Sequence, residues 1–248
     1  AVSNRQVDLK QLAADETLTI AGARLDALSP LLRMAKVDLT TSGVANGQLK
    51  LAAAGIDHLS ANGDIKVAGL TATGPLLKGD TYSTKVLNIP VDLSIASANS
   101  SAAVVTIKTL AVEFDQGKIT VAGAAPLDAL ASAARLLPAA LQQATSSSKA
   151  SAVAWQGGNG QLTVTVDVPD IASIANQLPH LLQLQKGLTL SGGALHHQSA
   201  LALSADKAVL TTATDLTHVA GQADGKPVTL QPLPLSAGAT ATPSPTPS

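Results

Sequence analysis

The sequence contains no cysteine and almost no aromatic residues. One Trp, one Tyr and one Phe make up 1% of its 248 residues, although 46% of the chain is hydrophobic. Without cysteine there is no disulfide framework, and the chain is compatible with an oxidising or a reducing compartment. Compact cores normally use aromatic side chains as bulky filling. The hydrophobic contacts of this protein must therefore come from Leu, Val, Ile and Ala.

Charge is scarce as well. Charged residues make up 13% of the chain and the net charge is −1, about half the charged share of an ordinary soluble domain. Acidic and basic residues are spread along the sequence, so the electrostatic footprint of a nucleic-acid-binding protein is missing. Neither a basic amphipathic helix nor an apolar run of about 20 residues is present. Because the chain begins with Ala1, we expect a processed form or fragment that has lost an upstream signal or anchor.

The chain has instead long stretches of alternating hydrophobicity. In residues 161–168, Leu and Val occupy every second position and Thr and Asp occupy most of the others, which is typical of a half-buried strand. Pro169 ends this strand, and Asp170 is placed to cap a helix whose apolar stripe reaches Leu182. After Gly187 a new alternating segment begins. The predicted unit is a strand, a short capped helix and a second strand.

Two other places repeat this unit. Leu25-Asp26-Ala27-Leu28 and Leu127-Asp128-Ala129-Leu130 each follow a short alternating run that ends in glycine. The sequence therefore predicts three helix caps, at Asp26, Asp128 and Asp170. We interpret the Asn-Gly pairs at 46–47 and 62–63 as hairpin turns, and Asp115-Gln116-Gly117 as another hairpin.

These segments predict a mainly β protein with an elongated, curved antiparallel sheet and three short amphipathic helices. Residues 1–144 form a strand-rich segment with two strand-helix units, and residues 145–158 form a Ser/Gly-rich linker or long loop. Residues 159–236 hold the third unit and the closing strands, and residues 237–248 form a disordered Pro/Ser/Thr tail. The alternative is an ordinary β-sandwich with three incidental helices.

Residues with catalytic or metal-binding chemistry are isolated in the sequence. His196 and His197 are adjacent in a predicted strand, so their side chains point to opposite faces and cannot easily share a metal. The other three histidines have no second ligand at metal spacing. Capping explains the three aspartates, and no G-x-S-x-G elbow is present. We therefore predict a protein without enzymatic activity, metal or cofactor, and rank an enzyme that uses two converging carboxylates last.

The aliphatic rows are the strongest candidate for a functional surface. Three short helices cannot cover a sheet of this many strands, so its apolar side either closes against a second sheet or stays open as a groove. An open aliphatic groove would suit acyl chains or a partner protein. The residues predicted to line it are Ile119, Val121, Leu162, Val164, Val166, Leu188 and Leu190.

The three strand-helix units, the repeated Asn-Gly-Gln-Leu at 46–49 and 159–162, and the run from Val166 to Gly193 together resemble bacterial AsmA/TamB-type envelope proteins. The resemblance covers residues 15–220 and is one of style rather than of a strict motif. It implies a long β-sheet whose hydrophobic inner groove crosses the periplasm from an inner-membrane helix, with a role in phospholipid movement and outer-membrane assembly.

The partners implied by this resemblance are a phospholipid or another acyl-chain lipid and outer-membrane assembly proteins. The location it implies is the periplasm, with an inner-membrane anchor upstream of the residues given. This chain lacks the anchor helix and is shorter than most members, so we interpret it as a fragment or a C-terminal segment. The competing interpretation is a structural or adhesion β-sandwich module without a ligand.

Overall fold

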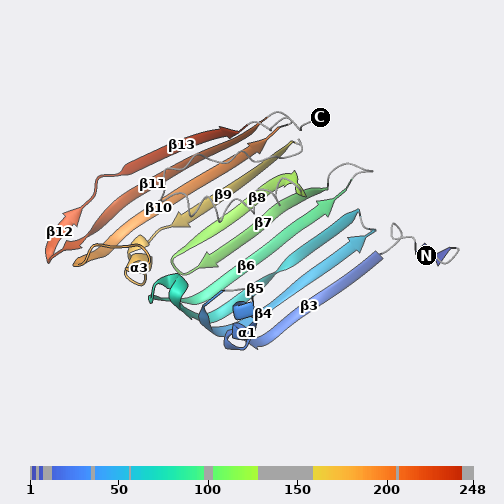
Figure 1. The fold of residues 1–248 in the computed structure, drawn as a ribbon, viewed down its shortest axis with the longest axis horizontal. Helices are drawn as coiled ribbons and strands as arrows, with labels where there is room; N and C mark the ends of the chain where they lie inside the picture. Colours follow the sequence, from blue (N-terminus) through green and yellow to red (C-terminus); the bar gives the residue numbers. More distant parts are fainter. Residues whose placement is uncertain are drawn as a thin grey trace.

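One large open sheet dominates the structure, a computed structural model (Figure 1). Eleven strands, β3 to β13, pair antiparallel in the order β12-β11-β10-β9-β8-β7-β6-β5-β4-β3, and β13 follows β12 end to end along the outer side of β11. A separate small hairpin of β1 and β2 precedes the sheet. The residues that the structure describes are 2–3, 6–7, 13–34, 37–55, 57–97, 103–127, 159–204 and 207–241.

The strands are long and follow one another along the chain as a meander. Their bounds are β1 Val2–Ser3, β2 Gln6–Val7, β3 Ala13–Arg24, β4 Thr40–Ala54, β5 His58–Thr73, β6 Thr81–Ala96, β7 Val104–Phe114, β8 Gly117–Pro126, β9 Gly160–Val168, β10 Leu188–Leu203, β11 Ala208–Ala223, β12 Lys226–Thr229 and β13 Leu233–Ala241. The prediction of a mainly β, antiparallel sheet is confirmed.

The described helices are short and sit in the connections at one end of this sheet (Figure 1). The 3-10 turn η2 (Leu25–Leu28) and helix α1 (Ser29–Met34) connect β3 to β4, η3 (Pro75–Leu77) connects β5 to β6, and α3 (Ile171–Ala175) connects β9 to β10. In a meander, alternate connections fall at the same end, so all of these elements line one margin of the sheet.

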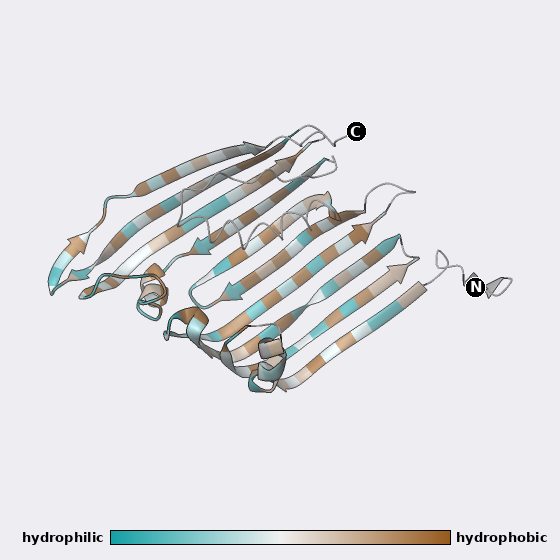
Figure 2. Ribbon diagram, in the orientation of Figure 1, coloured by the Kyte–Doolittle hydropathy of each residue, from teal (hydrophilic) through white to brown (hydrophobic). Residues whose placement is uncertain are grey.

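Hydrophobic residues alternate with polar ones along most strands (Figure 2). Successive side chains of a strand point to opposite faces, so this period of two gives each strand an apolar and a polar side. In an antiparallel pair, directly opposed residues share a face. The register of the sheet therefore decides whether the apolar residues of neighbouring strands share one face of the sheet. In this sheet they share one face.

Two of the predicted hairpin turns are wrong. Asn46-Gly47 lies inside β4 and Asn62-Gly63 lies inside β5. A Cβ atom added at Gly63 would collide with the Gln48 carbonyl group on β4, so glycine serves here for close approach of two backbones. The Asn46 side chain accepts a hydrogen bond of 2.8 Å from the Gly22 amide on β3, at a register irregularity. The hairpin between β7 and β8 at residues 115–116 is as predicted.

The predicted division of the chain needs one correction. Residues 237–241 belong to β13 rather than to a disordered tail, because their backbone pairs with residues 208–212 of β11. The predicted linker at 145–158 lies outside the described residues. The strands on either side of it, β8 and β9, pair directly, so the two predicted segments belong to one sheet.

The described strands form a single layer. The alternative of a closed β-sandwich is wrong, because the long strands all belong to one open sheet. The accessible surface of the protein is 16006 Å², about 1.6 times the roughly 10,200 Å² that mass scaling gives for a compact monomer. Burial here comes mainly from neighbours within the sheet.

Candidate functional site

Aliphatic side chains of β5 to β9 gather on one side of the sheet, called here the aliphatic face. The cross-strand pairs Val91–Leu110, Leu110–Val121 and Val121–Val164 carry this side continuously from β6 to β9. The residues that define the face are Leu59, Ile65, Val67, Leu87, Ile89, Val91, Leu93, Ile95, Val105, Ile107, Leu110, Val112, Ile119, Val121, Leu162, Val164, Val166 and Val168.

Most of this face is only half-buried. Val67, Val105 and Val168 are buried, whereas the remaining members are partly accessible or exposed. At the margins of the sheet the same residue types are more open, and Leu18 on β3 and Leu235 on β13 are 51% and 55% exposed. No large side chain among the described residues is completely buried. A second layer packed on this face would bury its central rows fully, as in a sandwich core.

Five of the seven predicted lining residues lie together on this face. Ile119 pairs with Val166 and Val121 pairs with Val164, and Leu162 continues the same side of β9. Leu188 and Leu190 lie elsewhere, at the start of β10 beyond two register shifts, where they pair only with β11. On the side of β10 that faces away from β11, none of the described strands lies beside Leu190. Its amide and carbonyl groups bond the side chain of Asn176 there. The sequence did not show that β9 ends before it reaches them.

A shallow hollow of about 320 Å³ lies over this face at the end of the sheet opposite the helices. Its apolar walls come from β4, β5 and β6, with Glu16 of the edge strand β3 at its rim. The side chains of the aliphatic face that contribute are Leu59, Leu93 and Ile95, extended on β4 by Leu51 and Ala53. Period two could have predicted these residues, because Leu59, Leu93 and Ile95 each occupy an alternating position on their strand.

Helix α3 packs at the opposite end of the same face. A Cβ atom added at Gly193 of β10 would come within 2.7 Å of the Ile171 side chain, so Ile171 lies over this glycine. The helix begins as predicted, because the Asp170 carboxylate accepts hydrogen bonds from the Ala172 and Ser173 amides. The hydrogen bond from the Ser173 hydroxyl group is the largest influence that lowers the pKa of Asp170. Asp170 is therefore a structural cap.

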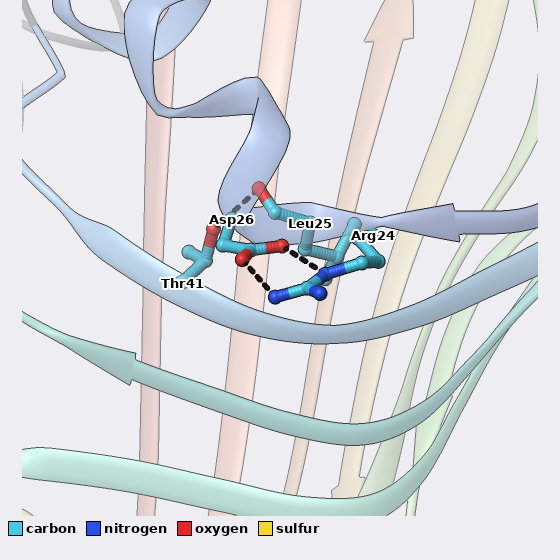
Figure 3. Close-up of polar contacts among 4 residues, drawn as sticks. All are labelled: Arg24, Leu25, Asp26 and Thr41. Carbon is cyan, nitrogen blue, oxygen red and sulfur yellow. Dashed lines mark hydrogen bonds and ion pairs between the residues drawn. The ribbon is translucent and has the colours of Figure 1, made fainter.

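The other two predicted caps differ in outcome. Asp26 is not a cap: it lies inside η2, and the N-cap residue of this turn is Arg24, which makes no side-chain capping hydrogen bond. Its carboxylate instead accepts two hydrogen bonds from Arg24, the shorter being 2.6 Å, and this guanidinium group lowers the pKa of Asp26 (Figure 3). The Thr41 hydroxyl group ties the turn to β4 through the Leu25 carbonyl group. Asp128 lies outside the described residues.

The connection that carries α3 is bonded to a distant part of the sheet. Asp80, at the end of the β5–β6 connection, accepts hydrogen bonds from the Leu181 amide at 2.8 Å and contacts His180 Nδ1 at 2.6 Å. The Ser83 amide donates to the Gln177 side chain at 2.7 Å. Burial would raise the pKa of Asp80, but the Leu181 amide and His180 outweigh it and lower this pKa. Sequence reasoning missed this pair because 100 residues separate its members.

The opposite side of the sheet, called here the polar face, carries pairs of charged and amide groups. Asn88 donates to Glu113 at 2.8 Å, and Lys118 lies 2.7 Å from the same carboxylate. Further along the row, His196 Nδ1 contacts Asp167 at 2.5 Å. Lys118 and Asp167 are direct cross-strand partners, which joins the two groups into one ladder.

The two adjacent histidines point to opposite faces, as predicted. His196 pairs with Asp167 on the polar face, whereas His197 pairs with Val166 and lies on the side of the aliphatic face. Within the described part of the chain, no group of three or more His, Asp or Glu side chains is arranged to hold a metal ion. The described helices also include none long and apolar enough to cross a membrane.

Comparisons of the whole chain with protein-family models, with curated proteins and with solved structures found no match. The function of this protein must therefore be inferred from its surface. The aliphatic face can bind apolar groups by burial, because it offers hydrocarbon contacts over five strands and none of its members is charged.

Proposed function

We propose that this protein is a non-enzymatic lipid-handling segment of the bacterial envelope, in which the aliphatic face contacts acyl chains. The single observation that supports this function is the continuous row of half-buried Leu, Val and Ile side chains across β5 to β9 in a single-layered sheet. Soluble monomers rarely expose contiguous apolar patches larger than a few hundred Å². An apolar surface of this kind marks a binding site for a ligand or partner.

The chemistry of the face favours hydrocarbon chains over other apolar partners. Protein interfaces are enriched in Trp, Tyr, Phe, Met and Arg, and sugar sites use aromatic stacking platforms. The residues that define the aliphatic face are all Leu, Ile or Val, and the aromatic residue Phe114 lies at their margin, opposite Leu87. Branched aliphatic side chains offer apolar contact area but no directional hydrogen bonds, and this suits flexible acyl chains that are bound by burial alone.

The resemblance to AsmA/TamB-type proteins supports the same proposal and supplies its setting. In that setting the protein lies in the periplasm, is held at the inner membrane by an upstream segment, and acts in lipid transport or outer-membrane assembly with partner proteins there. The sheet would be one stretch of a longer hydrophobic groove.

The experiment is lipid retention. The full chain is expressed in bacteria, purified without detergent and analysed by native mass spectrometry and by lipid extraction, and co-purified phospholipid is the expected result. Val164→Asp places a charge in the middle of the face and should reduce retained lipid severalfold. The matched control is Thr163→Asp, since Thr163 pairs with Ala122 and Ala200 on the polar face and should leave retention unchanged.

A lipid-free wild type would overturn the proposal. Equal retention in the Val164→Asp and Thr163→Asp variants would overturn the assignment of the face, because lipid would then bind elsewhere. The protein would remain a single-layered scaffold in either case.

A further inference from the structure

Four polar side chains interrupt the apolar side of the sheet on β10 and β11. His197 is directly opposite Thr214, and Ser199 is directly opposite Thr212. All four are half-buried, and His197 bonds two of the others, through Nδ1 to the Thr214 hydroxyl group at 2.7 Å and through Nε2 to the Ser199 hydroxyl group at 2.8 Å. These residues are called here the polar island.

Apolar residues surround this polar island. Along the strands, the pair Leu195–Leu216 bounds it on one side and the pair Leu201–Leu210 on the other. Across the strands, the two partners on β9 are valines of the aliphatic face, and the two partners on β13 are Leu235 and Ala237. The island covers about 5 Å across the strands and about 7 Å along them. It has room for one small polar group.

Hydrogen-bonding capacity remains in the island after its internal bonds are made. A neutral imidazole ring donates one hydrogen bond and accepts one, so one of the two bonded hydroxyl groups donates to His197 and the other accepts from it. The hydroxyl group that accepts keeps its own hydrogen available, whichever tautomer is present. Thr212 donates to the Ala237 carbonyl group at 3.3 Å and keeps its lone pairs. The island therefore offers a hydroxyl donor and several acceptors.

The surroundings favour an uncharged ligand group. Asp167, His196 and Asp215 belong to the same strands, but they pair with one another on the polar face. On the island's side, the paired residues of β9, β10, β11 and β13 include no lysine, arginine or carboxylate. A phosphate group moved from water onto this patch would have no cation to compensate its lost hydration. A carbonyl or hydroxyl group needs only the hydrogen bonds that the island offers.

We propose that the polar island binds the uncharged ester linkage of a glycerolipid whose acyl chains lie on the adjoining aliphatic face. The inference rests on the proposed function, which places acyl chains on β5 to β9. The ester carbonyl oxygen accepts a hydrogen bond from the hydroxyl group whose hydrogen His197 leaves free. This bond places the polar part of the lipid on β10 and β11, beside the acyl chains on β5 to β9. The aliphatic face supplies affinity, and the island supplies selectivity for esters.

The test compares two probes that differ in one chemical feature. Dioctanoylglycerol has ester carbonyl groups, and its dioctyl ether analogue has the same chains without them. Binding of each to the full chain is measured by titration calorimetry below the aggregation concentration of the probes. One neutral hydrogen bond predicts that the wild type binds the ester about five- to tenfold more tightly than the ether.

The variant His197→Leu/Ser199→Ala/Thr214→Val removes the three island side chains that bond one another, and Thr212 keeps its hydrogen bond to the Ala237 carbonyl group. It should bind both probes with the affinity that the wild type shows for the ether. Gln198→Leu is the matched control, because Gln198 lies between two island residues but pairs with Thr165 on the polar face. This control should keep the preference for the ester. If this triple variant does not fold, His197→Phe/Ser199→Ala/Thr214→Val takes its place, because it keeps a planar ring at position 197 and still removes all three bonding groups.

The outcomes separate the two proposals. A wild type that binds both probes with equal affinity would overturn the island while leaving the lipid-binding face in place. A preference for the ester that survives in whichever triple variant folds would also overturn it. A wild type that binds neither probe would contradict the proposed function and the island with it.

Discussion

The two faces of this sheet are built from the same strands but are stabilised differently. On the aliphatic face, neighbouring Leu, Ile and Val side chains bury one another without direction, and the cross-strand pairs repeat over five strands. On the polar face, Asn88, Glu113 and Lys118 meet at defined distances of 2.7 to 2.8 Å. A slip of one residue would exchange the two faces completely.

Stability and strand register have different sources in this single-layered sheet. Burial of apolar area contributes free energy that scales with area, about 25 cal/mol per Å². Exposed ion pairs contribute little stability, typically below about 1 kcal/mol, yet opposite charges placed across strands penalise wrong registers. We infer that the aliphatic face drives folding and excludes slips of one residue, and that the polar face selects among the registers that remain.

The largest effect on stability is expected from a charged substitution where the aliphatic face is most buried. Val168 is 5% exposed, so Val168→Asp places a charge among apolar neighbours without a partner and should lower the free energy of unfolding by about 3 kcal/mol. Thr163→Asp on the polar face should stay within about 1 kcal/mol of the wild type. Urea denaturation followed by circular dichroism measures both.

An intermediate substitution sharpens this test. Val164 is only half-buried, so Val164→Asp should lower the free energy of unfolding by less than Val168→Asp does. If the two variants were equally destabilised, the centre of the face would be covered as completely as its end, and the single-layered description would not hold in solution.

Much of this architecture could be predicted from period two alone. Alternation in residues 161–168 predicted β9, and it predicted that Val164 and Val166 share a side, because strand geometry is local. Asp170 was predictable for the same reason, since a cap bonds amides two and three residues ahead. The Asn-Gly pairs misled because glycine also serves inside a strand when another backbone approaches closely, as at Gly63.

The parts that could not be predicted depend on which strands become neighbours. His197 and Thr214 form one cluster because the β10–β11 register places them opposite each other. Asp80 meets His180 only because the β9–β10 connection reaches across the tip of the β7–β8 hairpin, whose residue Gln116 itself bonds Tyr82. No local pattern encodes such contacts. Leu188 and Leu190 lie apart from the other five predicted lining residues for the same reason, since the length of β9 decides what lies beside them.

A smaller effect is expected where a helix meets the aliphatic face. Asp170→Ala removes the cap of α3, the helix that places Ile171 over Gly193, and should cost about 1 kcal/mol of stability. Asp170→Asn keeps a capping oxygen atom and should fall within about 0.5 kcal/mol of the wild type. Hydrogen exchange of the Ala172 and Ser173 amides measures the local effect. Unchanged exchange in Asp170→Ala would show that packing alone holds this helix.

The smallest effect is expected on the polar face. The Lys118 and Glu113 side chains are 47% and 37% exposed, so a double-mutant cycle of Lys118→Ala and Glu113→Gln should give a coupling free energy of at most about 0.5 kcal/mol. Hydrogen bonds from Lys118 and then Asn88 lower the pKa of Glu113 in the folded protein.

The pKa shift fixes the sign of the pH dependence. The coupling is fully present above the ordinary pKa of a glutamate and disappears as the pH falls through the lowered pKa of the folded state. The cycle is therefore measured by urea denaturation at neutral pH and again below that range, and in low and high salt. A coupling above about 2 kcal/mol at neutral pH would exceed what exposed pairs supply. The polar face would then stabilise the fold as well as select its register, and the contrast between the faces would fail.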